Sequence, residues 1–374
     1  MTALAATLAV LSAALFLWSY GAYPALIGAL ARRRGAPPPP ASGRPPASAE
    51  VLVSAADEEA VIGARVRDLL AQPEAASVAV GCDGCRDGTA RAARDAGGGR
   101  IRVVEFAARR GKAAVLNDLV ASSDAEILVF TDANTRFEAG ALRALLAPFA
   151  DPSVGAVCGR LILEAPGGAT PEAALWDRET RTKEAEGALG VCVGANGAIY
   201  AARRALVRPL PPDTTSMDDF LIPVGAARAG SRVVFAGDAV AREDAARGIA
   251  AEARRRVRIG IGAGQVLRRE TWLLSPARGL LALAFASRKA ARWLAPLLGL
   301  LAAAAALATP YRGYGAAVLA AAGLLAGSAV FVRRAGGIAG RLYYFAVLNV
   351  ALAAGVAAGL CGARRPAWTR TERG

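Results

Sequence analysis

The sequence predicts an α/β protein with a parallel or mixed sheet, helices on both faces of that sheet, and transmembrane helices at both termini. Three observations support this fold class. Short apolar runs alternate with stretches of helical spacing between residue 50 and about residue 235, as in sheets wound with helices. Charge-free blocks of membrane-spanning length lie near both ends. Polar residues follow several apolar runs, where the carboxyl ends of parallel strands bind ligands.

The composition narrows the possible functions. The 374 residues are 54% hydrophobic, carry a formal net charge of +14 and include no histidine. The absence of histidine excludes a Ser-His triad and His-ligated zinc. The basic residues form no compact stripe interleaved with aromatic residues, so we expect no nucleic-acid partner. An anionic lipid leaflet and an anionic nucleotide substrate would account for the positive charge.

The N-terminal segment is predicted to be a membrane anchor. Residues 1–31 carry no charged side chain, and Arg32, Arg33 and Arg34 follow them. A cleaved signal peptide would begin with a basic region, which this segment lacks. By the positive-inside rule, a transmembrane signal anchor over 1–31 places its carboxyl end in the cytoplasm. Residues 32–49 are basic and proline-rich, which predicts a stiff linker.

A domain over residues 50–270 is expected to hold the sheet. Its predicted strands are Val51–Val53, Val78–Val80, Ile101–Val104 and Ile127–Phe130. Its predicted helices are Ala60–Leu70, one that begins near Thr89, and Ala113–Val120. Acidic residues come after the first, second and fourth strands, which puts three polar clusters at one edge of the sheet.

The fourth strand ends in a candidate metal site. Asp132 and Asn134 follow its apolar run and are separated only by Ala133. In an extended segment the two side chains would point to the same side. Their oxygens suit a hard divalent cation such as Mg²⁺ or Mn²⁺. The alternative is a polar strand end that caps the next helix.

Cys82 and Cys85 form a C-x-x-C pattern among Asp and Gly residues that favour a turn. A closed zinc site lacks further ligands, because the chain has no histidine and no second C-x-x-C. A redox pair usually opens a helix. We therefore expect two small turn residues in a reducing compartment, with a redox role as the alternative.

Several short motifs occur in a fixed order between Val51 and Gln265. They are Ser54-Ala55-Ala56-Asp57-Glu58-Glu59, Cys82-Asp83-Gly84-Cys85-Arg86-Asp87-Gly88-Thr89, Arg109 to Asn117, Asp132-Ala133-Asn134, Gly194 to Tyr200, and Met217-Asp218-Asp219-Phe220. This series resembles membrane-anchored family 2 glycosyltransferases of the GT-A fold, related to cellulose, hyaluronan and poly-N-acetylglucosamine synthases. Their counterparts include P-A-Y-N-E-E, S-D-G-S-x-D-G-T, R-x-G-K-x-x-A-L-N and D-x-D. An ordered series is more specific than any single motif.

The resemblance implies a role for each matched residue. The expected donor-binding residues are Asp57, Glu58, Asp83, Lys112, Asn117, Asp132, Arg255 and Arg258. Asn196 and Gly197 lie in the segment that resembles the acceptor side, and Asp132 and Asn134 face the diphosphate and the metal. Asp219 is the expected catalytic base, with Asp218 as the second choice. Direct attack assisted by one base would invert the anomeric centre. Helix starts, capping residues and turns are the structural alternatives for these residues.

Three departures from the family pattern affect the expected activity. Ala56 replaces an aromatic residue beside the nucleobase, and Asn134 is neutral where many relatives carry Asp. The processive synthases' Q-x-x-R-W is here Arg255-Arg256-Val257-Arg258-Ile259, which lacks the stacking Trp. We therefore expect transfer of one or a few sugars rather than long-chain polymerisation.

The C-terminal third is predicted to contact the membrane. Residues 271–292 are expected to be interfacial, because the apolar stretch Gly279–Ser287 is too short to span a bilayer. Residues 293–362 hold three charge-free blocks, Trp293–Tyr311, Gly313–Val332 and Leu342–Gly362, and 363–374 form a tail. Three spans here would put the arginines of the tail outside, against the positive-inside rule. One block, such as the last, is then re-entrant or interfacial, which leaves two to three spans.

The sequence thus predicts a multi-pass protein of the plasma (inner) membrane with a cytoplasmic catalytic domain. It would transfer a sugar from a nucleotide-sugar donor, UDP-linked, to a lipid-linked or glycan acceptor with the aid of Mg²⁺ or Mn²⁺. Such a reaction would serve the synthesis of cell-envelope or extracellular polysaccharide. The first alternative is a non-catalytic nucleotide-sugar-binding relative with a regulatory or scaffolding role at the membrane. The second is a transporter, which the absence of acids and bases inside the spans disfavours.

Overall fold

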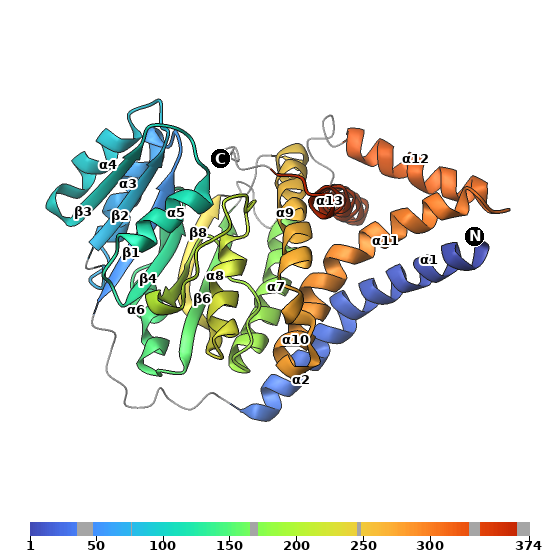
Figure 1. Cartoon of the computed structure of the whole chain (residues 1–374), viewed down its shortest axis with the longest axis horizontal. Coiled ribbons are helices and arrows are strands. Elements are labelled where there is room, and N and C mark those ends of the chain that lie inside the picture. The colour runs from blue at the N-terminus through green and yellow to red at the C-terminus, as the bar shows by residue number, and fades with distance from the viewer. Residues whose placement is uncertain (36–47, 76, 165–170, 245–247, 329–336, 365–374) are drawn as a thin grey trace. The chain divides into compact units, whose positions relative to one another are not determined.

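A computed structural model describes residues 1–35, 48–75, 77–164, 171–244, 248–328 and 337–364 of the chain. Most of the predicted linker lies outside these residues. The chain divides into two compact units (Figure 1). The sheet unit lies within Gly28–Ala245, and the helical unit within Met1–Ile27 and Ala246–Arg364.

The sheet unit holds one eight-stranded sheet in the order β3-β2-β1-β4-β7-β6-β8-β5 (Figure 1). Its strands are β1 (Ala49–Ala55), β2 (Ser77–Asp83), β3 (Ile101–Phe106), β4 (Ile127–Asp132), β5 (Arg136–Phe137), β6 (Val154–Glu164), β7 (Tyr200–Arg203) and β8 (Arg232–Asp244). The pairs β3-β2, β2-β1, β1-β4 and β6-β8 are parallel, whereas β7 runs antiparallel to β4 and β6, and β5 runs antiparallel to β8. The sheet is therefore mixed, and its four predicted strands are confirmed.

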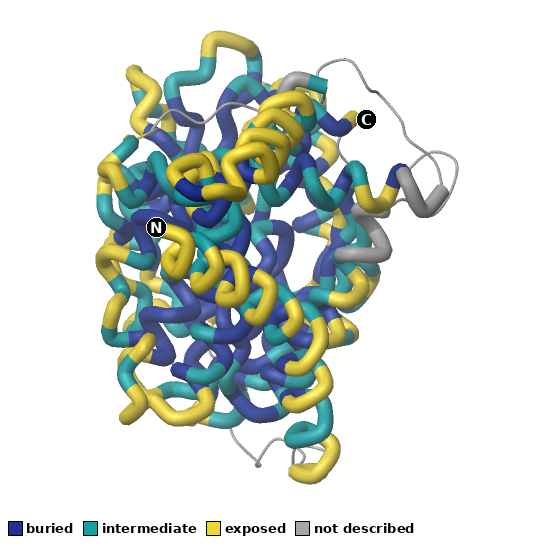
Figure 2. Tube along the Cα trace, turned by 90° about the vertical axis from the view of Figure 1, so that its right-hand side faces the viewer, coloured by how far each residue is buried: buried dark blue, intermediate teal, exposed yellow. Residues whose placement is uncertain are grey.

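Helices cover both faces of this sheet. On one face, α3 (Glu59–Leu70) and α4 (Thr89–Gly97) bury Ile62, Val66 and Leu69 with alternate residues of β1 and β2. On the other face α5 (Lys112–Ala121) lies so close to β2 that a Cβ on Gly81 would meet the Val115 side chain at 2.3 Å. The remaining helices are α6 (Ala141–Leu146), α7 (Pro171–Ala188) and α8 (Asp218–Arg228). In Figure 2 many of the buried residues, in dark blue, lie toward the inside of the trace, and many exposed residues, in yellow, lie at its margins.

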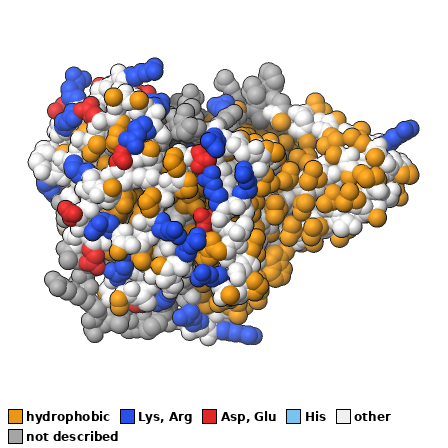
Figure 3. Space-filling view, in the orientation of Figure 1, with side chains coloured by type: hydrophobic (Ala, Val, Ile, Leu, Met, Phe, Trp, Pro, Cys, Tyr) orange, Lys and Arg blue, Asp and Glu red, His pale blue; other side chains and the backbone are white. Residues whose placement is uncertain are grey.

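The helical unit contains α9 (Ile249–Arg269), a helix over Leu280–Ala306, α12 (Arg312–Ser328) and α13 (Gly337–Leu360). It also contains residues 2–27 of the helix Thr2–Arg34, whose last turns belong to the sheet unit. Among the described residues, three helices are long and apolar enough to cross a membrane: Thr2–Arg34, Leu280–Ala306 and Gly340–Leu360. On the face that Figure 3 shows, apolar side chains cover much of this unit, and Val10, Leu17 and Leu324 are each at least 70% exposed.

The helix Leu280–Ala306 differs from the prediction. The stretch Gly279–Ser287 was expected to lie at the interface by itself, because it is too short to span. In the structure α10 (Leu280–Ala284), a π-helical segment (Phe285–Ala290) and α11 (Ala291–Ala306) follow one another without a break. Arg288 and Lys289, which interrupt the apolar run, lie within the π-helical segment and do not end the helix. The candidate span therefore begins at Leu280 rather than at Trp293.

Candidate active site

Three acidic residues lie at one edge of the sheet, where the sequence places them. β1 pairs in parallel with both β2 and β4, so the carboxyl ends of these three strands are neighbours. Asp57 follows β1, while Asp83 and Asp132 are the last residues of β2 and β4. The parallel pairing therefore brings together groups that are up to 75 residues apart in the chain, since 132 minus 57 is 75.

Lys112 joins two carboxylates at this edge. It is the first residue of α5, and its Nζ lies 2.9 Å from Asp132 Oδ1 and 3.0 Å from Asp218 Oδ2. Burial lowers the pKa of the Lys112 ammonium, but Asp132 and Asp218 outweigh that effect and raise its pKa above the usual value. The site therefore has one fixed positive charge between two negative ones.

Tyr200 is a residue of this cluster that sequence reasoning missed. Its hydroxyl donates to Asp218 Oδ2 over 3.0 Å, and its ring stacks on Phe130 at a centroid distance of 4.8 Å. Burial and the nearby Asp218 raise the pKa of Tyr200 well above its usual value, so the hydroxyl stays protonated and remains a donor. The position of Tyr200 at the end of the Gly194–Tyr200 motif is the sequence feature that could have indicated its place in this cluster.

Asp218 and Asp219 begin α8 but have different surroundings. Asp218 is 6% exposed and is held by Lys112 and Tyr200. Asp219 is half-buried, and its backbone carbonyl accepts the N–H of Ala195 over 2.7 Å. The Asp219 side chain is thus the more accessible carboxylate of the two, as a base that meets an acceptor requires.

Gly197 leaves space beside the cluster. A Cβ at this position would lie 3.2 Å from Asp132 Oδ2 and 4.0 Å from Lys112 Nζ. The preceding Asn196 is 2% exposed; Lys183 donates to its Oδ1, and its Nδ2 donates to the Gly159 carbonyl over 2.8 Å. The two predicted acceptor residues therefore differ: Gly197 borders the cluster, whereas the Asn196 side chain is bonded inside the protein.

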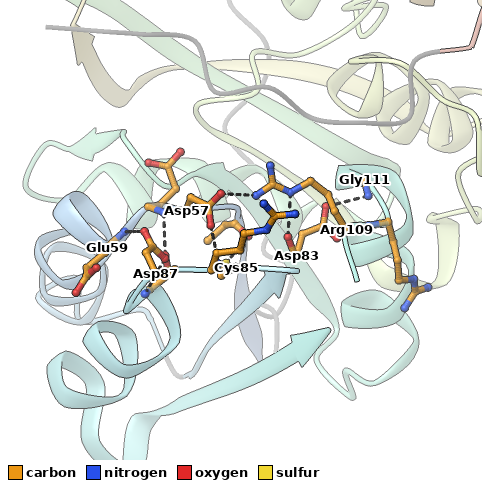
Figure 4. A network of polar contacts seen from close by, with 12 residues as sticks. Asp57, Glu59, Asp83, Cys85, Asp87, Arg109 and Gly111 are labelled. Carbon is orange, nitrogen blue, oxygen red and sulfur yellow. Dashed lines mark hydrogen bonds and ion pairs between the residues drawn. The ribbon is translucent and has the colours of Figure 1, made fainter. Parts of the chain in front are cut away.

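Asp83 holds the loop that leads to Lys112 (Figure 4). The Asp83 side chain is fully buried, and its two carboxylate oxygens accept the backbone N–H groups of Arg110 (2.6 Å) and Gly111 (2.8 Å). Gly84 has a φ of +55°, and a Cβ there would lie 2.5 Å from the Arg109 nitrogen. This glycine is therefore needed for the close approach of the two segments.

Asp57, which follows β1, lies at the same edge and close to Arg109 (Figure 4). Its carboxylate accepts the N–H of Arg86 over 2.8 Å and pairs with Arg109 over 2.6 Å. These two contacts lower the pKa of Asp57, so it is ionised at neutral pH. Its neighbour Glu58 is 6% exposed, and the Glu58 N–H donates to Thr89 Oγ1.

Asp57, Cys85 and Asp87 each offer one ligand atom, and these atoms lie within 4.8 Å of one another (Figure 4). All three side chains already have protein partners: Asp57 binds Arg109, Cys85 contacts the Ala55 carbonyl, and Asp87 accepts the N–H groups of Glu59 and Thr89. A soft thiol is also a poor ligand for Mg²⁺. The oxygens near Asp132 suit that metal better.

The C-x-x-C prediction is corrected in one respect. Only Cys85 lies in the turn, whereas Cys82 belongs to β2 and is 1% exposed, because the strand extends to Asp83. Both are free thiols. Burial and the adjacent Cys85 raise the pKa of Cys82 to about 12, which is typical of an inert thiol.

Asn134 lies in a turn rather than in an extended strand. β4 ends at Asp132, and the N–H of Thr135 approaches the Asp132 carbonyl at 3.5 Å. The argument from alternating side chains therefore fails at this residue, although Asn134 remains two positions from Asp132.

Two of the other predicted donor residues, Asn117 and Arg255, have protein partners of their own. The Asn117 side chain donates to the Leu210 carbonyl (2.9 Å) and accepts the Leu210 N–H (2.8 Å). Arg255 and Arg258 belong to α9 of the helical unit, where Arg255 pairs with Glu252 over 2.8 Å. Their roles toward a donor stay predictions.

Comparison with known proteins identifies the family. The model described as glycosyltransferase like family 2 matches residues 45–262, which is more than half of the chain. The chain belongs to this family. It is therefore a glycosyltransferase, and an enzyme is favoured over the non-catalytic alternative.

Two relatives extend this result. This glycosyltransferase superposes on the mannosyltransferase PcManGT from Pyrobaculum calidifontis, which was solved in complex with GDP-Man and Mn²⁺. The TM-score is 0.64 and the sequence identity is 23%. The superposition covers 94% of this chain and 99% of that chain. That likeness shows the GT-A fold. The succinoglycan biosynthesis protein ExoU of Rhizobium meliloti is 40% identical over 98 residues, 26% of this chain. The match spans 29% of the length of ExoU.

Proposed function

We propose that this glycosyltransferase moves a sugar from a UDP-linked donor to a lipid-linked or glycan acceptor, with inversion, in the synthesis of cell-envelope or extracellular polysaccharide. The observation that carries the proposal is the cluster of Lys112, Asp132 and Asp218 beside Gly197 at the carboxyl edge of the sheet. Ligands of open α/β sheets bind at this edge. The short match to ExoU supports the polysaccharide context.

The reaction exchanges one C–O bond for another. The acceptor oxygen bonds to the anomeric carbon as the bond to the diphosphate breaks, and UDP leaves with that electron pair. Asp219 takes the proton of the acceptor hydroxyl, because it is more exposed than Asp218, which is buried. Lys112 lies where a cation can stabilise the charge that gathers on the leaving group.

The residues near Asp132 fit a divalent cation. A Cβ at Gly197 would lie 3.2 Å from Asp132 Oδ2, so the glycine keeps a side chain away from this carboxylate oxygen. Asp132 and Asn134 supply oxygen ligands, which Mg²⁺ and Mn²⁺ prefer. A bound cation would neutralise the diphosphate as its charge develops. Lys112 shares the Asp132 carboxylate with such an ion.

The three candidate spans support a multi-pass protein. We place it in the plasma (inner) membrane with the sheet unit in the cytoplasm, where nucleotide sugars are made. The arginines at positions 32–34, directly after the first span's apolar part, agree with a cytoplasmic end under the positive-inside rule. A membrane-bound enzyme keeps its site close to a lipid-linked acceptor.

The test is nucleotide release by the full chain in detergent, from a panel of UDP-sugars and GDP-mannose, with Mn²⁺, Mg²⁺ or EDTA. We expect metal-dependent release from a UDP-sugar when membrane lipid extract is the acceptor. Asp219→Asn should lower turnover by about 10²–10⁴-fold and keep nucleotide affinity, whereas Asp218→Asn should also lower stability. Release from GDP-mannose alone would overturn the UDP assignment, and full activity of Asp219→Asn would overturn the base.

A further inference from the structure

One face of α3 carries a buried polar stripe that none of the matched motifs includes. The stripe consists of Arg65 and Asp68, which are three residues apart and therefore on one side of the helix, and of Gln72, which lies just after the helix ends at Leu70. Arg65 is 2% exposed and Gln72 is 5% exposed. Burial is the main cause that lowers the pKa of Arg65 to about 10. Because burying a guanidinium is costly, its contacts must compensate.

The contacts of this stripe go to the segment that carries Asp132 and Asn134. On the amino side, Arg65 donates to Thr131 Oγ1 over 2.7 Å, and Thr131 donates in turn to the Ala198 carbonyl over 2.6 Å. Thr131 precedes Asp132, and Ala198 follows Gly197. Through Thr131, Arg65 is therefore linked both to the end of β4 and to the backbone at Ala198, next to Gly197.

The carboxyl side of the segment is held by the same stripe. Asp68 pairs with Arg65 and accepts the N–H of Phe137 over 3.1 Å, while the Arg65 guanidinium lies 4.2 Å from the centre of the Phe137 ring. Gln72 then donates to the Glu138 carbonyl over 3.0 Å. The turn between Thr131 and Phe137 is thus fixed at both ends.

A contact from the opposite side completes the arrangement. Thr135 donates to Glu243 Oε1 of β8 over 2.7 Å, and both residues are buried. Residues that are fixed by these contacts therefore flank the two proposed metal ligands: Thr131 precedes Asp132, and Thr135 and Phe137 follow Asn134. A short turn that is fixed in this way can present two oxygens in one geometry without help from the ion.

From these contacts we propose that Arg65 and Asp68 are positioning residues, which set the geometry of Asp132 and Asn134 for the divalent cation. The inference rests on the proposed metal site. Neither residue touches the donor, and both act through the turn. Partners that orient metal ligands typically change metal affinity by about 10–100-fold when they are removed.

The experiment is a titration of the full chain in detergent with Mn²⁺, followed by EPR of the free ion, with UDP or GDP present. Arg65→Lys keeps the charge but loses the fork that reaches Thr131 and Asp68 together, and Asp68→Asn removes the ion pair. Leu69→Ala is the matched control, because Leu69 is fully buried on the same helix and has an apolar side chain. Each variant is assayed at the same interval below its own melting temperature, so that differences in stability do not affect the comparison.

We expect Arg65→Lys and Asp68→Asn to weaken Mn²⁺ binding about 10–100-fold, while metal-free nucleotide affinity stays unchanged and Leu69→Ala binds Mn²⁺ normally. Equal loss of Mn²⁺ affinity in all three variants would show a merely structural role and overturn the inference. Unchanged Mn²⁺ affinity in both polar variants would do the same. If the wild type itself binds no Mn²⁺ with either nucleotide, the proposed metal site is wrong, which is a separate failure.

Discussion

The ammonium of Lys112 lies 3.0 Å from Asp218 and 2.9 Å from Asp132, so one cation holds together the start of α8 and the end of β4. These two acidic residues are 86 positions apart, since 218 minus 132 is 86. Without a cation between them their charges would repel each other at the proposed diphosphate position. Lys112 and its two carboxylates therefore form a structural link, and under the proposed function they would also be a preformed element of the donor site.

Replacing this lysine tests both roles. Lys112→Met removes the charge and leaves the two carboxylates without their shared cation. Because the three side chains are only partly buried, at 20%, 26% and 9% exposure, we expect the free energy of unfolding to fall by about 1–3 kcal/mol, between surface and buried pairs. Thermal unfolding in detergent measures this, and a titration with UDP should show at least about tenfold weaker binding. Lys112→Arg, which keeps the charge, is the control; unchanged stability and UDP binding in Lys112→Met would contradict both roles.

Gly197 allows a local test of the space beside Asp132. Gly197→Ala would place a Cβ 3.2 Å from Asp132 Oδ2 without requiring a left-handed backbone. We expect metal-supported donor affinity to fall by about tenfold, or about 1.4 kcal/mol, with little change in melting temperature. Gly237→Ala is the control, since nothing lies within 4 Å of a Cβ there. Equal effects of the two substitutions would show that Gly197 has no special place in the site.

The sequence predicted the amino half of the sheet well because its signals are local. The strands β1 to β4 are apolar runs bounded by turn residues, and α3 to α5 follow them at the expected positions. Parallel pairing then placed Asp57, Asp83 and Asp132 at one edge. Residue type and order were enough for that step.

Long-range contacts explain what the sequence could not show. The antiparallel insertion of β7 between β4 and β6 depends on pairing between distant segments. The Asn117 amide binds the Leu210 backbone 93 residues away, and Arg65 reaches Thr131 across 66 residues. No periodicity within a local window reveals such partners, so the contact of Asn117 with Leu210 and that of Arg65 with Thr131 could not be predicted.

The buried carboxylate of Asp83 predicts a stability effect that reaches the active site. Asp83→Asn can still accept one of the N–H groups of Arg110 and Gly111 but leaves the other facing an NH₂ group. We expect a loss of about 1–3 kcal/mol in the free energy of unfolding, with weaker UDP binding because the loop before Lys112 loosens. Asp118→Asn is the control, since its pair with Arg110 is more than 40% exposed and such pairs contribute little. A neutral Asp83→Asn, in both denaturant unfolding and UDP titration, would rule out this role.

The raised pKa of Cys82 predicts a thiol that resists alkylation. A thiol with a pKa of about 12 is almost wholly protonated at pH 8, and only the thiolate reacts. Iodoacetamide at pH 8 should leave Cys82 unmodified in the native protein and modify it after unfolding, as peptide mapping by mass spectrometry would show. Rapid native labelling of Cys82, or a Cys82–Cys85 disulfide in protein isolated without reductant, would instead favour the redox alternative.

The number of spans predicts the side on which the chain's last described residues lie. Three crossings, by Thr2–Arg34, Leu280–Ala306 and Gly340–Leu360, would return the chain to the side of Arg34. Arg364 would then be cytoplasmic, as the positive-inside rule requires. A fourth crossing by the block at 313–332 would reverse this. Single cysteines at Arg34→Cys and Arg364→Cys, in a chain whose own five cysteines are replaced by serine or alanine, can be labelled with an impermeant maleimide in oriented vesicles. We expect both to react only in inverted vesicles; labelling of Arg364→Cys from the outer side alone would establish the fourth span.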